Sequence, residues 1–158
     1  MMEDNNEKWE IIRQNPEEQV IEILENRANA EGWKTIDKNV GRVQGVDLKL
    51  LKANNVIVIE AKGEREGPPQ HRSELNGVLG EIIMDMKEEK LHQVYSYCIA
   101  FPKTDRFRRT VDNIPLKPRQ RLGLNIIFVD CSTRLLTVLQ SAAQHEIALN
   151  NFDELCGS

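Results

Sequence analysis

The sequence is poor in residues that build several common kinds of site. It contains three cysteines and three histidines among 158 residues. Neither set has the spacing of a ligand group, so we do not expect a zinc site. Unpaired cysteines in odd number are typical of a reduced compartment, so we expect a cytoplasmic protein.

Long apolar runs and phosphate-binding loops are also missing. No stretch approaches the length needed to span a bilayer, and the first seven residues are acidic and polar, unlike a signal peptide. We therefore expect no membrane association. The sequence has no glycine-rich loop ending in Lys-Ser/Thr, no Gly-x-Ser-x-Gly elbow and no dinucleotide fingerprint. These absences argue against NTPase motors, acyl transfer and dinucleotide binding.

The length of the chain suits one domain, residues 1–158, and we expect a loosely ordered segment at 1–15. The net charge of −4 is unevenly spread, because residues 1–31 carry nine acidic and three basic side chains. Residues 103–121 carry seven basic side chains against two acidic ones. This asymmetry suits a protein that meets a polyanion on one side. A solvated helix face is the alternative.

The most distinctive stretch is residues 56–62, a β-branched apolar run that ends in Glu60, Ala61 and Lys62. It predicts a strand buried on both faces, at the centre of a sheet covered by helices. Because side chains alternate along a strand, Glu60 and Lys62 share one face.

Asp47 comes from the preceding predicted strand, residues 45–51. A two-residue loop at Asn54-Asn55 would pair Asp47 with Lys62 and Lys49 with Glu60, which places Asp47, Glu60 and Lys62 on one face. A three-residue loop would move Asp47 to the other face. Two carboxylates beside a lysine suit a hard cation such as Mg²⁺, and a cross-strand salt bridge is the alternative.

Val46-Asp47, a gap of twelve residues and Glu60-Ala61-Lys62 together resemble the PD-(D/E)XK nuclease signature, with Val46 where proline is frequent. The resemblance implies a restriction-endonuclease-like α/β fold, with a central mixed sheet of four to six strands flanked by helices in the order α-β-β-β-α-β-α-β. It also implies DNA hydrolysis, by an endonuclease, that depends on Mg²⁺ or Mn²⁺. Asp47, Glu60 and the main-chain carbonyl of Ala61 would hold the metal, and Lys62 would position the attacking water.

Two predicted helices offer supporting carboxylates. The first opens at Pro16, runs to about residue 31 and is capped by Gly32. In the resembling family a glutamate of this helix assists the metal, and Glu18 comes before Glu22 as the candidate. The second helix, about residues 72–89, contributes Glu81 and, more weakly, Glu74. Gly77 and Gly80 each weaken that helix by about 1 kcal/mol, so we expect a close backbone approach there.

The remaining expectations concern the second half of the chain and the partners. We expect strands at residues 93–101, 124–130 and 134–139, the last at an edge, and a short closing helix at 141–149. Cleavage of both DNA strands would favour a homodimer. A catalytically silent nuclease-fold module that binds nucleic acid or a protein, and a structural subunit of a larger system, are the rival interpretations. The predicted DNA contacts are Arg65, Arg72, Arg106, Arg108, Arg109, Arg119 and Arg121.

Overall fold

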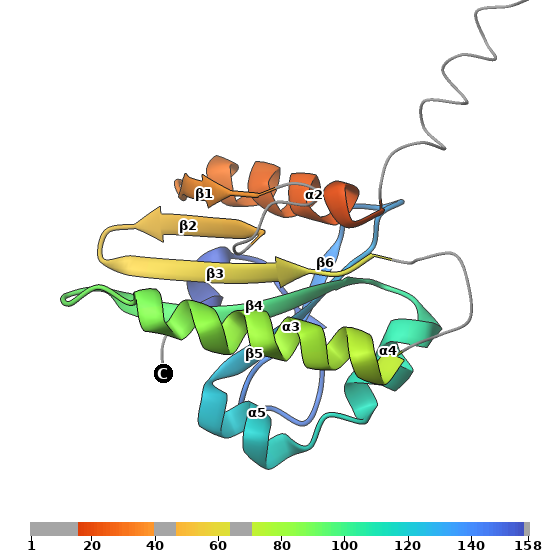
Figure 1. Cartoon of the computed structure of the whole chain (residues 1–158). Coiled ribbons are helices and arrows are strands. Elements are labelled where there is room, and N and C mark those ends of the chain that lie inside the picture. Colours follow the sequence, from red (N-terminus) through yellow and green to blue (C-terminus); the bar gives the residue numbers. More distant parts are fainter. Residues whose placement is uncertain (1–15, 40–46, 64–70, 157–158) are drawn as a thin grey trace, which may run out of the picture.

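The protein is built around one seven-stranded mixed sheet (Figure 1). A computed structural model describes residues 16–39, 47–63 and 71–156, except for the side chains of Pro16 and of residues 71–75. The expectation for residues 1–15 therefore lies outside the described residues. The elements are α2 (Pro16–Ala30), β1 (Lys34–Lys38), β2 (Leu48–Lys52), β3 (Asn55–Ala61), α3 (His71–Asp85), η1 (Met86–Glu88), β4 (Val94–Pro102), α4 (Asp105–Asp112), α5 (Leu116–Leu122), β5 (Leu124–Val129), β6 (Leu136–Leu139), β7 (Ile147–Ala148) and η2 (Phe152–Leu155).

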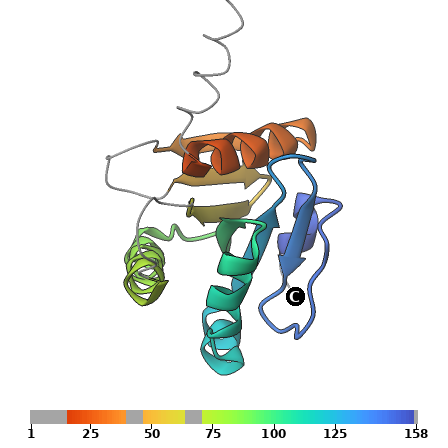
Figure 2. The same cartoon turned by 90° about the vertical axis from the view of Figure 1, so that its right-hand side faces the viewer.

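The strands follow the chain order across the sheet, from β1 at one edge to β7 at the other. β3, β4 and β5 pair in parallel at the centre, and the outer pairs are antiparallel. A parallel centre needs helices on both faces, which the chain supplies. α2 covers one face together with η2, and α3 and α4 cover the other, as Figure 2 shows for the two sides of β2 and β3.

Each face of the sheet has its own core. Ile57 and Ile59 of β3 pack with Leu24 of α2. Val56 and Val58 point the other way, into a core that also contains residues of α3 and α4. Strand alternation thus assigns each residue of β3 to one of two helical layers. The double-sided burial predicted for this strand is confirmed.

The β2–β3 hairpin has a different register from the predicted one. Lys52 pairs with Asn55, so the loop is Ala53-Asn54, and Lys49 faces Val58 instead of Glu60. Ala53 adopts a positive φ of 53°, which is unusual for a residue with a Cβ atom. The predicted pairings are wrong by two residues. A shift of two residues equals one full side-chain period of a strand. Asp47 therefore still lies on the same face of the sheet as Glu60, as expected.

The second half of the chain departs further from expectation. The sheet has seven strands instead of four to six, so both the strand number and the order of elements differ. β6 confirms a strand near residues 134–139, but it is not the edge. The predicted helix at 141–149 is wrong, because Ile147 pairs with Val138 to form β7. A two-residue strand is too short to show an alternating pattern in the sequence.

Two sets of glycines behave differently. Gly32, the second residue after α2, takes φ 91°, and its N–H donates to the Asn29 carbonyl, which confirms the predicted cap. A Cβ atom added at Gly77 or Gly80 would meet nothing within 4 Å. The expected close backbone approach at these two glycines is therefore wrong for the described residues.

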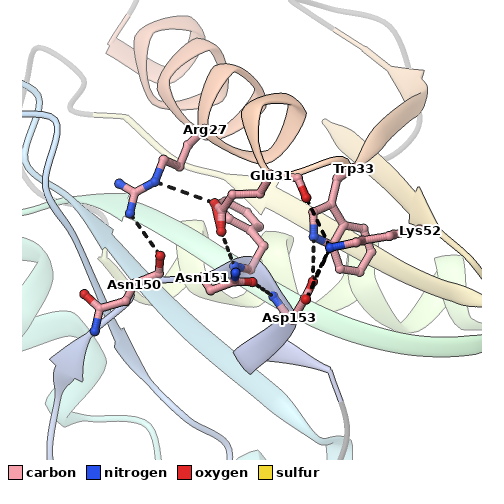
Figure 3. A network of polar contacts seen from close by, with 8 residues as sticks. Arg27, Glu31, Trp33, Lys52, Asn150, Asn151 and Asp153 are labelled. Atoms are coloured by element: carbon pink, nitrogen blue, oxygen red, sulfur yellow. Dashed lines mark hydrogen bonds and ion pairs between the residues drawn. The ribbon is translucent and has the colours of Figure 1, made fainter.

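A polar network ties the C-terminal segment to the first half of the chain (Figure 3). The Asp153 carboxylate accepts hydrogen bonds from Trp33 Nε1 at 3.1 Å and from Lys52 Nζ at 3.1 and 3.2 Å. Glu31 accepts from the main-chain N–H of Phe152 at 2.8 Å. The network holds η2 over the α2 face, where Phe152 and Leu155 are buried. In the described ranges, no helix has the length and apolarity that a membrane crossing requires.

Candidate active site

The candidate site lies where β3 leaves the sheet. Glu60 follows Val56 and Val58 on the α3-facing side and is only 4% exposed. Lys62 extends the pairing beyond the strand, since its main-chain N–H donates to the Ala100 carbonyl at 2.9 Å. Its side chain is half-buried. A carboxylate and an ammonium two residues apart thus sit at the carboxyl end of a buried strand.

Asp47 lies next to Glu60, one residue before β2 begins. Its Oδ2 accepts the main-chain N–H of Ala61 at 2.7 Å, and its own N–H donates to Glu60 Oε1 at 3.3 Å. In each bond a side-chain carboxylate from one strand end accepts a main-chain N–H from the other, so the two bonds join the ends of the two strands. The hairpin therefore brings Asp47 and Glu60 together, as the sequence predicted, although through a different register.

The electrostatics of the pair follow from this proximity. Burial raises the pKa of Glu60 to about 9, and the charges of Asp47 and Glu81 and a hydrogen bond with Asp47 add to the rise. Burial also raises the pKa of Asp47, against the lowering effect of the Ala61 N–H, Glu60 and Lys62. When no metal ion is bound, two adjacent carboxyl groups with raised pKa values hold one proton between them.

Glu81 is the third acidic group near the pair, and the helix geometry explains its position. Lys49 Nζ of β2 contacts Asp85 Oδ1 of α3 at 3.5 Å. α3 and β2 run in the same direction (Figure 1). Glu81 lies four residues before Asp85, about 6 Å along the helix, and Asp47 lies two residues before Lys49, about 7 Å along the strand. Because the helix and the strand run in the same direction, Glu81 lies beside Asp47. The effect of the Glu81 charge on both carboxyls agrees with this placement.

The other supporting carboxylates are less well placed. α2 packs on the opposite face, where Ile21 and Leu24 join Ile57 in one core. Glu18 is half-buried and Glu22 is exposed, and a role for either in the site stays a prediction. The side chain of Glu74 lies outside the described residues. The α2 glutamates were ranked above Glu81 because the family resemblance points to a glutamate of the first helix. No local sequence pattern shows which helix covers which face of the sheet.

The donor set fits a hard divalent ion only in part. Asp47 and Glu60 offer adjacent carboxylate oxygens, the ligand type that Mg²⁺ and Mn²⁺ prefer. Among the residues that the structure describes, no three His, Cys, Asp or Glu side chains are arranged as a metal site. The two carboxylates leave most coordination positions to water, which suits Mg²⁺ because it retains several waters in proteins.

The predicted DNA contacts fall into several groups. Arg119 is 5% exposed and donates a hydrogen bond to the Ala143 carbonyl, so it is not available to a phosphate in this structure. Arg108 pairs with Glu146 at 2.9 Å, and Arg106 lies over the Phe107 ring. Arg109 and Arg121 are exposed. Arg65 and the side chain of Arg72 lie outside the described residues.

A cavity of about 500 Å³ lies at the opposite end of the parallel strands. Ser96 of β4 and Asn125 of β5 line it, together with Gln140 and Glu154. None of the predicted site residues belongs to this lining. Nothing in the sequence indicated the cavity, because its walls come from four segments that are distant in the chain.

Comparison with known proteins supports the fold alone. No family model and no curated protein matches the chain. An XisH family protein from Nostoc punctiforme PCC 73102 has a similar structure, with a TM-score of 0.52 and 16% identity over 75% of this chain and 95% of that one. An FdxN element excision controlling factor protein from Anabaena variabilis has a TM-score of 0.53 and 17% identity over the same shares. The chain thus has an α/β fold of the kind found in these two proteins, which fits the nuclease fold that the sequence resemblance implies.

Proposed function

We propose that this protein is a metal-dependent nuclease that hydrolyses DNA phosphodiester bonds, as an endonuclease. The observation that carries the proposal is the contact between Asp47 and Glu60 at the end of β3, with Lys62 two residues beyond. The alternative, a cross-strand salt bridge, joins opposite charges and does not account for two carboxyl groups in contact with each other.

Each residue then has a chemical role. Asp47, Glu60 and the main-chain carbonyl of Ala61 would hold Mg²⁺ or Mn²⁺. The bound ion would polarise a phosphoryl oxygen and lower the pKa of a bound water. Lys62 orients the attacking water and stabilises negative charge on the phosphate. Glu81 holds further water molecules near the carboxylates.

The substrate side of the proposal rests on charge and position. α4 follows the carboxyl end of β4. Lys62 lies at the same end of the parallel strands, since its main-chain N–H donates to the Ala100 carbonyl of β4. Exposed Arg109 on α4 offers a phosphate contact at this end without breaking an internal ion pair that the structure describes. Arg121 is also exposed, but it lies just before Gly123, at the end of the parallel strands where the cavity is, away from Lys62. Such contacts supply affinity that does not depend on sequence.

The rival function is a nuclease-fold module that binds nucleic acid or a protein and performs no cleavage. One similar structure is described as an excision controlling factor, and that description names no cleavage activity. In the rival account Asp47 and Glu60 remain a protonated pair and have no measurable affinity for Mg²⁺.

The deciding experiment has two readouts. Plasmid, linear duplex and single-stranded DNA are incubated with the protein, with and without Mn²⁺, and Mg²⁺ binding is measured by calorimetry. Glu60→Gln and Lys62→Ala should lower cleavage at least ~100-fold, the usual effect of removing one group that stabilises a transition state. Lys87→Ala, which removes an exposed lysine, is the matched control. Wild-type rates in both site variants would refute the assignment.

Calorimetry separates the two functions even if the right substrate has not been found. Asp47→Asn should abolish Mg²⁺ binding under the proposal, because it removes one of the two carboxylate ligands. A wild-type protein that binds no divalent ion at pH 8 would favour the silent module.

A further inference from the structure

The cavity at the far end of the parallel strands from the candidate active site has the size and the lining of a ligand site. Its volume of about 500 Å³ falls within the range of small-molecule pockets. Two of its polar side chains are almost fully buried, since Ser96 is 8% exposed and Asn125 is 7% exposed. Tyr95 contributes an aromatic ring, and Gln140 and Ser141 contribute further polar groups. Hydroxyl and amide groups of this kind bind the uncharged polar part of a small molecule.

Hydrogen bonds between distant segments hold the walls of this cavity in place. The main-chain N–H of Ser141 donates to Asn125 Oδ1 at 3.0 Å, and Asn125 Nδ2 donates to the Leu155 carbonyl at 3.5 Å. Gln140 Nε2 donates to the Glu154 carbonyl at 3.3 Å. β5, the loop after β6 and η2 are thus joined around the space, so the cavity exists before any ligand enters it.

A buried cation lies behind one wall. Arg119 of α5 is 5% exposed, and its Nη2 donates a hydrogen bond to the carbonyl of Ala143, which lines the cavity. Its Nε is buried and has no hydrogen-bond partner in the part of the chain that the structure describes. Burial lowers the pKa of this guanidinium, and no carboxylate among the described residues opposes the effect. A buried charge without a counter-ion is unfavourable, so an anion on the other side of this wall would stabilise the protein.

The other charges around the cavity leave its balance positive. Glu154 is the one carboxylate in the lining that the structure describes, and it is exposed, so water and salt screen its charge. The neighbouring Asp153 is paired with Lys52. Arg121, at the end of α5 next to the cavity, adds an exposed positive charge. Arg119 is buried, and a buried charge is screened much less than an exposed one.

We propose that this cavity binds a small organic anion, a molecule that carries one phosphate or carboxylate group on an uncharged polar body. The anionic group lies against the wall formed by Ala142 and Ala143. Arg119 attracts it through its charge and not by direct contact, because the Ala143 carbonyl occupies its Nη2 donor. The polar body contacts the Tyr95 ring and the hydroxyl and amide groups of the lining. The site shares no residue with the proposed nuclease centre, so failure of one proposal leaves the other standing.

Isothermal calorimetry at fixed ionic strength tests the ligand class with matched probes. Ribose 5-phosphate and galacturonate supply the two anionic groups, and ribose and galactose are their uncharged counterparts. At least one of the anions should bind with a dissociation constant below about 1 mM, and its sugar should bind at least about tenfold more weakly. The stronger of the two anions identifies the preferred group. Absence of binding by both anions, or an anion affinity no higher than that of its sugar, overturns the proposal.

Substitutions then test the position of the anion. Arg119→Met removes the buried charge and should weaken binding by about tenfold or more. Lys117→Met removes an exposed lysine of the same helix and is the matched control, with a change below about twofold. Glu154→Lys reverses the exposed charge at the cavity and should strengthen binding by about threefold, an effect that a folding defect does not produce. Unchanged affinity in Arg119→Met, or weaker binding in Glu154→Lys, overturns the proposal.

One further variant separates this cavity from the candidate active site. Lys62→Ala should bind the anion with the affinity of the wild type, because Lys62 lies at the other end of the parallel strands. Loss of binding in Lys62→Ala would place the anion at the candidate active site and would overturn the assignment to the cavity.

Discussion

Replacing Glu60 by glutamine tests the physical state of the candidate site without any substrate. Glutamine has the shape of a protonated glutamate and keeps the oxygen that accepts the Asp47 N–H. It carries no titratable proton. The variant therefore removes the shared proton and leaves the contact in place, so its effect on stability reports the titration alone.

The direction of the effect follows from the raised pKa. Folded Glu60 titrates near pH 9, and its ordinary pKa is 4.5. Between these values the folded protein holds a proton that the unfolded chain has released. This stabilising contribution is complete below pH 4.5 and is lost progressively as the pH rises to about 9. The free energy of unfolding of the wild type should thus fall with pH by up to about 1.4 kcal/mol per unit.

Between pH 6 and pH 8 the fall amounts to about 3 kcal/mol. For a chain of this size that corresponds to a drop in melting temperature of roughly 6–12 °C. The measurement is thermal and urea unfolding at pH 6, 7 and 8 in the presence of a chelator. Glu60→Gln should show a flatter profile and exceed the wild type at pH 8. Glu88→Gln, which removes an exposed carboxylate, should follow the wild type.

Divalent ions provide the second half of this test. Mg²⁺ should restore the stability of the wild type at pH 8, because a bound ion takes the place of the shared proton, and it should not stabilise Glu60→Gln. Parallel pH profiles for the wild type and Glu60→Gln would refute the assignment of a proton-sharing pair.

Three further predictions concern other parts of the molecule. Ala53→Gly should raise the free energy of unfolding by about 0.5–1 kcal/mol in urea titrations, because Ala53 holds a positive φ that glycine adopts without strain; a destabilised variant would contradict this. Asp153→Ala should lower it by about 0.5–1.5 kcal/mol, because Trp33 Nε1 loses its acceptor while Lys52 Nζ keeps the Glu31 carbonyl, and the adjacent Glu154→Ala should have little effect. Arg109→Ala should weaken DNA binding and reduce the slope of log affinity against log salt by about 1, whereas Arg119→Met, a buried position, should leave that slope unchanged.

The hairpin shows how far sequence reasoning reached. The residue pattern predicted the apolar run of β3 and a two-residue loop before it. The predicted loop, Asn54-Asn55, begins one residue later than the observed loop, Ala53-Asn54. Asn54-Asn55 was favoured because asparagine tolerates positive φ. In the fold Ala53 takes that conformation instead. Lys52 then closes the ladder and reaches Asp153 and the Glu31 carbonyl, and the Asn54 carbonyl accepts from Val94. These partners lie in distant segments and leave no local trace.

The sequence by itself determined that Glu60 and Lys62 share one face of the sheet, because side chains alternate along a strand. Asp47 lies on that face because the hairpin loop has two residues, whereas a three-residue loop, which the sequence left open, would have moved it to the other face. Only the tertiary structure decided that α3, with Glu81, covers this face and that α2 covers the other. It also decided that Arg119 is buried and that Gly77 and Gly80 face outward. The physical reason is that periodicity is a property of neighbouring residues, whereas the layer that packs over a face depends on contacts between segments far apart in the chain.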